Sequence, residues 1–172
     1  MLKGEQIYLR TIEPADADII LKWENNSDNW RVSNTLIPFS RKLIQDYVNS
    51  AQDIYSIKQL RFIICLLENE KEIGAIDLFD FDPYHHKVGL GILIAELEDR
   101  RNGYAKEAVL LIKEYCFNHL NLHQVYCNVL SKNKASIDLF EKSGFTICGT
   151  KKDWIKNKEG WLDELMLQSF SV

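Results

Sequence analysis

The stretch EDRRNGYAKEA, residues 98–108, has the residue types of an anion-binding site. Arg100 and Arg101 stand directly before a segment with helical spacing, and Gly103 allows a tight turn at its start. The first turn of a helix exposes about four unpaired N–H groups and carries about half a positive charge. We expect Arg100 and Arg101 to add positive charge at the rim, so this arrangement suits a phosphate or a diphosphate. A solvated basic loop before an ordinary helix would explain the same residues.

Other phosphate motifs and metal motifs are missing from the sequence. It contains neither G-x-x-x-x-G-K-S/T nor G-x-G-x-x-G, so neither a nucleoside triphosphatase nor a dinucleotide-binding fold is indicated. His85 and His86 are typical of a polar loop, and no glutamate joins His119 and His123 in an H-E-x-x-H motif. We therefore expect no metal, and a zinc-dependent hydrolase is disfavoured.

The cysteines indicate a reducing compartment. They form no C-x-x-C pair, and each has apolar neighbours; they are Cys65, Cys116, Cys127 and Cys148. We expect four buried, reduced and unreactive thiols, and the cytoplasm as the compartment.

The elements that must position these residues follow from hydrophobic periodicity. Strands are predicted at residues 6–12, 61–67, 73–79, 88–94, 123–130, 146–154 and 161–170. Helices are predicted within residues 13–26, 40–52, 104–120 and 133–145, with Ser40 as a cap and Gly144 as a stop. This order predicts an α/β (α+β) fold in which helices pack on a mixed, largely antiparallel sheet.

Composition limits the classes of partner. The 172 residues fit a single domain, 1–172, with 46% hydrophobic residues for its core. The net charge of −4 disfavours nucleic acid and tolerates a cationic substrate. No segment approaches the ~18 apolar residues of a membrane helix, and MLKGEQIYLR does not read as a signal peptide.

Two motifs in order resemble the GNAT superfamily of N-acetyltransferases. The matching residues are Arg100-x-x-Gly103-x-Ala105, then Asn133-x-Ala135, then Lys142-x-Gly144-Phe145. The resemblance covers nearly the whole chain. It implies a GNAT-like sheet flanked by helices, acetyl-CoA as co-substrate and an amine as acceptor.

The resemblance also implies which residues hold acetyl-CoA. Backbone amides would bind its diphosphate, and they belong to Arg100, Arg101, Asn102, Gly103, Tyr104, Ala105 and Lys106. A strand that splays from its neighbour would pair with the pantetheine amides through Ile92, Leu93 and Ile94. Asn133 would contact the pantetheine arm, with Ser136 and Lys142 on the helix beside it.

Acetyl transfer needs an acid for the departing thiolate and a group that stabilises the carbonyl oxygen. A backbone N–H near Ile92 can supply the second. Many relatives place a tyrosine acid where this chain has Phe140, which cannot donate a proton and which we expect to pack in the core. Because a thiol has a pKa of ~8.5, water or the ammonium intermediate can serve instead. Tyr104 and Tyr126 are the nearest substitutes in the sequence.

The base that takes the proton of an amine with a pKa of ~10 is also not fixed. Relatives often carry a glutamate on the cofactor-binding strand, where this chain reads Gly89-Leu90-Gly91. The preceding segment, IDLFDFDP, resembles spermidine acetyltransferases and offers Asp80 and Asp77. We rank Asp80 first as base or substrate ligand, because it lies near the end of the strand. A solvated or turn-capping aspartate is the alternative.

Several residues around the expected acceptor site have two readings. Glu24, Asp28 and Trp30 follow the first helix, where members of the family often shape the acceptor site. Trp154 and Trp161 bracket a polar turn, and we expect them to pack the closing hairpin rather than to line a cleft.

These observations predict an acetyl-CoA-dependent N-acetyltransferase. A polyamine or another small primary amine is the favoured acceptor, and the N-terminal amine of a protein stays open. The alternative is a non-catalytic acyl-CoA-binding or regulatory module, which Phe140 and the missing strand glutamate support. The resemblance also leaves open a homodimer through the edge strands.

Overall fold

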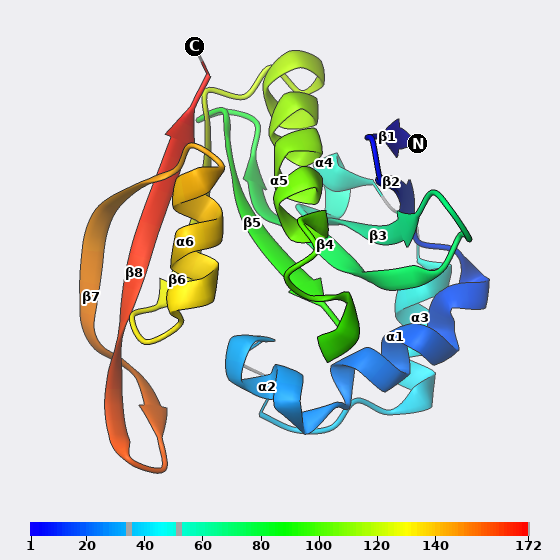
Figure 1. Ribbon diagram of the computed structural model, residues 1–172, viewed down its shortest axis with the longest axis horizontal. Helices are drawn as coiled ribbons and strands as arrows, with labels where there is room; N and C mark the ends of the chain where they lie inside the picture. Colours follow the sequence, from blue (N-terminus) through cyan, green and yellow to red (C-terminus); the bar gives the residue numbers. More distant parts are fainter. Residues whose placement is uncertain (34–35, 51–52, 172) are drawn as a thin grey trace.

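The computed structural model describes residues 1–33, 36–50 and 53–171 and has one eight-stranded sheet with helices on both faces (Figure 1). The strands are β1 Leu2–Lys3, β2 Ile7–Thr11, β3 Leu60–Leu66, β4 Glu72–Asp82, β5 Lys87–Ile94, β6 Gln124–Leu130, β7 Thr146–Asn157 and β8 Gly160–Phe170. The α-helices are α1 Ala17–Glu24, α2 Ser27–Ser33, α3 Arg41–Asn49, α4 Ile54–Ile57, α5 Tyr104–Glu114 and α6 Lys134–Lys142. Two 3-10 turns, η1 Pro14–Asp16 and η2 Leu97–Asp99, and a π-helical turn, η3 Tyr115–His119, complete the chain.

The sheet has the order β1-β2-β3-β4-β5-β6-β8-β7. Among the described strands only β5 and β6 pair in parallel, and every other neighbouring pair is antiparallel. This arrangement confirms the predicted mixed, mostly antiparallel sheet flanked by helices. None of the described helices is long and apolar enough to cross a membrane.

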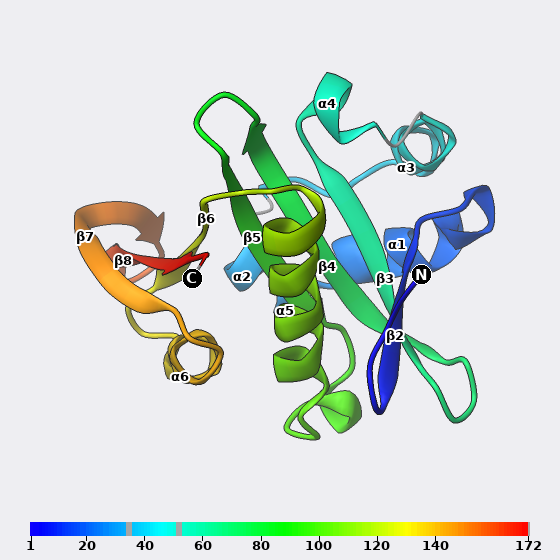
Figure 2. The same cartoon turned by 90° about the horizontal axis from the view of Figure 1, so that it is seen from above.

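Two apolar cores lie on opposite faces of the sheet, because successive side chains of a strand alternate between its faces. On β3, Ile64 belongs to the core under α5 and α6, whereas Ile63 belongs to the core under α1 and α3. Figure 2 shows α5 and α6 on one side of the sheet and α1 and α3 on the other. The helices therefore cover both faces around β3, β4 and β5.

Some elements differ from the sequence prediction. The strand β1 and the short helices α2 and α4 were not predicted, because two to seven residues carry too little periodicity to read. The strands of the closing hairpin also run further than predicted, to Asn157 and from Gly160. The helix predicted within 40–52 is observed as α3, and residues 51 and 52 lie outside the described residues.

Ser40 caps α3 as predicted, since its Oγ accepts a hydrogen bond from the N–H of Leu43 at 3.2 Å. We expect Ser40→Ala to lower the free energy of unfolding by about 1 kcal/mol, because that N–H loses its acceptor. Urea denaturation measures the change. Ser40→Asp keeps an acceptor at this position and should stay within about 0.5 kcal/mol of the parent. Equal losses in both variants would contradict a capping role.

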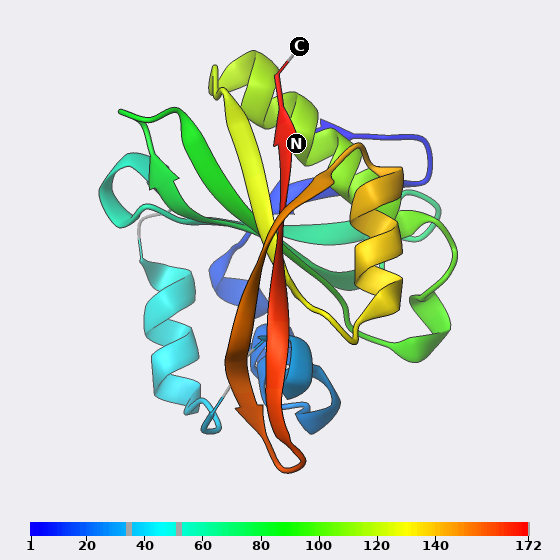
Figure 3. The same ribbon diagram turned by 90° about the vertical axis from the view of Figure 1, so that its left-hand side faces the viewer.

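The edge of the sheet overturns two predictions about burial. Cys65, Cys116 and Cys127 are buried, but Cys148 is exposed because it lies on β7, the outermost strand. Trp154 and Trp161 are 56% and 58% exposed, so they do not form a core for the hairpin. Figure 3 shows the β7–β8 hairpin projecting past the helices, and the rings of Trp154 and Trp161 lie beside lysines of the hairpin, Lys151 and Lys156.

Candidate functional site

The site begins where two neighbouring strands separate. The strands β5 and β6 pair only at Lys87↔Gln124, Val88↔Val125 and Gly89↔Tyr126. Beyond these pairs β5 continues to Ile94 and β6 continues to Leu130 without pairing to each other. The separation leaves one side of β5 without a neighbouring strand (Figure 1).

Two cavities adjoin at this separation. The larger, of about 660 Å³, lies towards α1 and α3, and the smaller, of about 90 Å³, lies beside α6. Both are lined by Leu90, Gly91, Ile92, Asn128 and Glu164. A ligand in the smaller cavity therefore lies next to one in the larger.

The backbone of Ile92 faces the separation. The N–H of Ala95 donates to the carbonyl of Ile73 on the β4 side at 2.9 Å. Because the direction of backbone groups alternates along a strand, those of Ile94 and Ile92 point away from β4. The carbonyl of Ile94 does so, since it accepts a hydrogen bond from Arg100 Nε at 3.0 Å. The N–H of Ile92 is thus directed to the opening between β5 and β6.

The loop before α5 presents a row of open N–H groups. The N–H of Arg100 is bound to the carbonyl of Leu97 at 3.2 Å, and the first helical bond joins Glu107 N to Gly103 O at 3.1 Å. Within the described chain, the N–H groups of residues 101–106 have no acceptor. Gly103 has φ 89°, a left-handed conformation that glycine adopts without strain. This helix end can therefore bind an anion of several oxygens.

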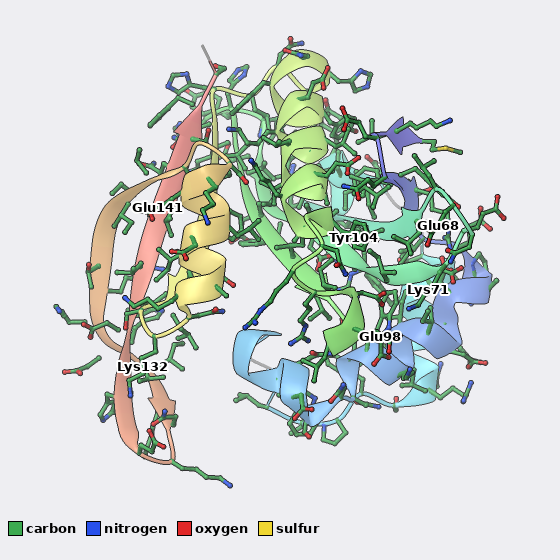
Figure 4. The ribbon with its side chains drawn as sticks, in the orientation of Figure 1. Glu68, Lys71, Glu98, Tyr104, Lys132 and Glu141 are labelled. Carbon is green, nitrogen blue, oxygen red and sulfur yellow. The ribbon has the colours of Figure 1, made fainter. Side chains whose placement is uncertain are left out.

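Charged side chains fix that loop from both sides. Lys71 Nζ contacts Glu98 Oε1 at 3.1 Å and Asp99 Oδ2 at 2.9 Å. Figure 4 shows Lys71 and Glu98 close together, and Tyr104 at the start of α5. Arg100, which we expected to add charge at the rim, instead binds the carbonyls of Ile94 and Ala95 at the end of β5. Arg101 is exposed and has no ion pair in the described chain, so it supplies a free positive charge.

Residues of α6 line the smaller cavity. Asn133 caps the helix, with its Oδ1 accepting from Ser136 N at 3.2 Å, and both residues line the cavity. Phe140 also lines it and is 3% exposed, packed edge-on against Phe145 at 5.2 Å between ring centroids. Lys142 is exposed in the last turn and lines neither cavity. The structure thus brings Asn133, Ser136 and Phe140 to the opening but not Lys142.

An arginine that we did not predict holds the acidic residues of the larger cavity. Arg61 contacts both oxygens of Asp77, at 2.6 and 3.0 Å, and Oε1 of Glu24 at 2.7 Å. Burial opposes the charge of Arg61, but the carboxylates of Asp77 and Glu24 outweigh it and raise the pKa of the guanidinium. Arg61 and Asp77 lie directly opposite each other in the β3–β4 hairpin. The available signal for this ion pair in the sequence was Arg61 itself, a charged residue directly before the apolar segment FIICLL.

The two candidate aspartates of β4, Asp77 and Asp80, lie in different places. Asp77 lines the larger cavity, whereas Asp80 lines neither cavity and is exposed. Pairing with β5 is irregular between Phe79 and Asp82, and Asp80 there has φ 50°, which turns it out of the regular alternation. Asp80 accepts a hydrogen bond from the Tyr126 hydroxyl at 3.4 Å. The structure therefore places Asp77, and not Asp80, in the wall of the larger cavity, which differs from our ranking of the two residues.

The tyrosines considered as acids lie away from the opening. Burial and Asp80 raise the pKa of Tyr126 to about 12, and Tyr126 sits where β5 and β6 still pair. Tyr104 packs against the core at the start of α5. Neither tyrosine lines either of the two cavities described above. The structure therefore does not place Tyr104 or Tyr126 where either could replace the tyrosine acid of the relatives.

One glycine of β5, Gly89, makes room for a side chain, and the other, Gly91, lines both cavities. A Cβ on Gly89 would come within 2.3 Å of the Phe79 ring, which would force the ring to move. A Cβ on Gly91 would lie 3.7 Å from the same ring. Phe79 itself lines the larger cavity. Gly89 therefore shapes the cavity wall indirectly, through Phe79, whereas Gly91 is part of the wall itself.

The larger cavity is acidic. Its charged lining residues are Glu24, Asp77, Glu164 and Arg61, three carboxylates against one guanidinium. Of the residues predicted near the acceptor, Glu24 lines the cavity, Asp28 is exposed, and Trp30 donates from Nε1 to the Glu24 carbonyl at 2.7 Å. Glu164 and Asn128 were not predicted, because only the pairing of distant strands brings them here. No group of three or more potential ligand side chains in the described residues could hold a metal ion.

Comparisons with known proteins agree with this geometry. A family model described as an acetyltransferase (GNAT) domain matches residues 6–146. A probable N-acetyltransferase of Bacillus subtilis, YjcK, is 25% identical over 97% of this chain and 95% of its own length. The spermidine N(1)-acetyltransferase of Vibrio cholerae is 26% identical over 83% of this chain and 80% of its own. The crystal structure of the Vibrio cholerae spermidine N-acetyltransferase with CoA and spermine has a TM-score of 0.87 at 22% identity, covering 97% and 96% of the two chains.

Proposed function

Because the chain belongs to the acetyltransferase (GNAT) family, we propose that it transfers the acetyl group of acetyl-CoA to a primary amine of a small polycation. The observation that carries the proposal is the acidic cavity that adjoins the separation between β5 and β6. A positively charged acceptor gains from carboxylates in such a partly enclosed space.

The residues around the opening fit acetyl-CoA, which supplies a reactive acetyl thioester when it is bound. The open N–H groups of residues 101–106 suit its diphosphate, and Arg101 adds a positive charge. Asn133, Ser136 and the backbone of Ile92 suit the pantetheine arm in the smaller cavity. The N–H of Ile92 can stabilise negative charge on the carbonyl oxygen.

Two features favour a polyamine over the N-terminal amine of a protein. Glu24 and Asp77 line the larger cavity beside Arg61, and Glu164 lines it near the opening, so carboxylates lie on β8 as well as on α1 and β4. A substrate with more than one ammonium group can contact Glu24 and Asp77 with one group and Glu164 with another. The proteins of known name that resemble this chain include spermidine acetyltransferases, which supports the same choice.

The experiment combines binding and turnover. Calorimetry should detect acetyl-CoA binding to the purified protein, and a thiol reagent should detect coenzyme A released only when an amine is added. The panel contains spermidine, spermine, short diamines, monoamines and peptides with free N-terminal amines. Binding without release across the panel would favour the non-catalytic module, and no binding would refute both readings.

Phe140 gives a direct test of how the thiolate leaves. It lines the smaller cavity at the position where many relatives carry a tyrosine, so Phe140→Tyr places a proton donor beside the departing sulfur. We expect kcat to rise about 3- to 10-fold in steady-state assays, a modest part of the range of general acid catalysis. Phe145→Tyr adds a hydroxyl to the neighbouring ring as a control and should not raise kcat. An unchanged kcat in Phe140→Tyr would mean that thiolate departure needs no protein acid.

A further inference from the structure

Glu164 is the carboxylate that lies at the junction of the two cavities. It comes from β8, lines both cavities and is 7% exposed as a residue. Asp77 and Glu24 line only the larger cavity, and Arg61 occupies both oxygens of Asp77. Glu164 is therefore the acidic residue nearest to the path between the thioester and the acceptor.

One oxygen of Glu164 is held and the other is open. Lys151 Nζ donates to Glu164 Oε1 at 2.8 Å and to Asn128 Oδ1 at 3.1 Å. Within the described chain, Oε2 of Glu164 has no hydrogen-bond donor. A buried carboxylate keeps its charge only when it is paired, and Lys151 provides that pair. The second oxygen is left to accept from a donor in the cavity.

We propose that Glu164 binds the reacting ammonium group and takes one proton from it before attack. The inference rests on the proposed function. The nitrogen then forms a bond to the acetyl carbon while the carbon–sulfur bond breaks. The second nitrogen proton passes to the thiolate, and Glu164 releases its proton to solvent. One ammonium and one acetyl thioester thus give an amide, a thiol and a proton.

The test compares the pH dependence of Glu164→Gln with that of the wild type, using spermidine as acceptor between pH 6.5 and 9.5. Wild-type kcat/KM should change little with pH, because Glu164 accepts the ammonium form. The variant needs the free amine, so its kcat/KM should rise about tenfold per pH unit towards the amine pKa of ~10. At pH 7 we expect a loss of about 100-fold. Acetyl-CoA affinity should stay within about twofold, which reports an intact fold.

Asp163→Asn is the matched control. Asp163 lies next to Glu164 on β8 and pairs with Lys152 on β7 at 2.7 Å, but it lines neither cavity. Its loss breaks an ion pair between the same two strands, so kcat/KM should stay near wild type at every pH. If Glu164→Gln is unstable, Glu164→Asp retains the charge one methylene further back. It should give an intermediate kcat/KM with a wild-type pH profile.

The outcomes distinguish a failure of the proposed function from a failure of the role assigned to Glu164. A wild-type protein that acetylates no amine overturns the proposed function and this inference together. If the wild type is active, a Glu164→Gln variant within threefold of it at pH 7 overturns the inference alone. So does a loss that is the same at every pH, because a purely structural ion pair lowers activity without changing the slope.

Discussion

Arg101→Glu should weaken binding of acetyl-CoA about 30-fold at low salt. Arg101 lies among the open N–H groups of residues 101–106 and is exposed without an ion pair in the described chain. The substitution changes the local charge by two units beside the proposed diphosphate. At about 1 kcal/mol for each unit, the loss is about 2 kcal/mol, and 1.4 kcal/mol is tenfold in affinity. Titration calorimetry measures the dissociation constant directly.

Salt and a matched variant show whether this effect is local. Because the Debye length falls from about 10 Å at 0.1 M salt to about 3 Å at 1 M, the difference from wild type should shrink as salt rises. Lys158→Glu makes the same change in net charge at the exposed turn between β7 and β8. It should alter affinity less than twofold. Equal weakening by both variants would show that only overall charge matters, and the proposed diphosphate site would be wrong.

Arg61→Met should lower the free energy of unfolding by about 3 kcal/mol or more. The Arg61 side chain is 18% exposed and binds Asp77 and Glu24, which are 32% and 16% exposed. Removing one partner of a largely buried ion pair leaves uncompensated charge, which is much more costly than losing an exposed pair. For a chain of this size, 3 kcal/mol corresponds to a fall in Tm of about 6–12 °C. Urea denaturation and calorimetry measure the two quantities.

Two further variants isolate the cause of that loss. Arg41→Met removes the exposed pair of Arg41 with Asp18, which lies on the surface of α1, and should cost less than about 0.5 kcal/mol. The triple variant Glu24→Gln, Arg61→Met, Asp77→Asn removes all three charges and should recover part of the stability. Losses of the same size in Arg41→Met and Arg61→Met would mean that burial of this cluster contributes nothing.

The features that the sequence predicted are those decided by neighbours along the chain. The cap at Ser40 and the open helix end at Gly103 depend on a few consecutive residues, so both could be read directly. The strands of the β3–β4 hairpin follow from alternating apolar residues around a polar turn. Periodicity predicted the order of the elements and a mixed, largely antiparallel sheet, and the resemblance to a family then implied the GNAT-like arrangement of that sheet and its helices.

The features that the sequence did not predict depend on contacts between distant strands. Glu164 reaches the cavity because β8 pairs with β6, more than thirty residues earlier in the chain, at Leu130↔Glu164. Arg100 was expected at the rim, and only the fold shows its side chain bound to carbonyls at the end of β5. Asp80 was ranked above Asp77 because it lies near the end of the strand, and the local bulge at Asp80 cannot be seen in IDLFDFDP. Trp154 and Trp161 were misjudged because the sequence does not show that the β7–β8 hairpin continues beyond Leu130↔Glu164, where the pairing of β8 with β6 ends.

The short contact between β5 and β6 affects the cohesion of the whole molecule. Three residue pairs join the part of the sheet that carries β1 to β5 to the part that carries β6, β8 and β7. A molecule bound between β5 and β6 would contact α5 and β5 in the first part of the molecule and α6 in the second. Anything that binds the folded form alone also stabilises it. Binding of the acyl donor would then hold the two parts of the sheet together and raise the free energy of unfolding, so the protein would be less stable in a cell that is short of that donor.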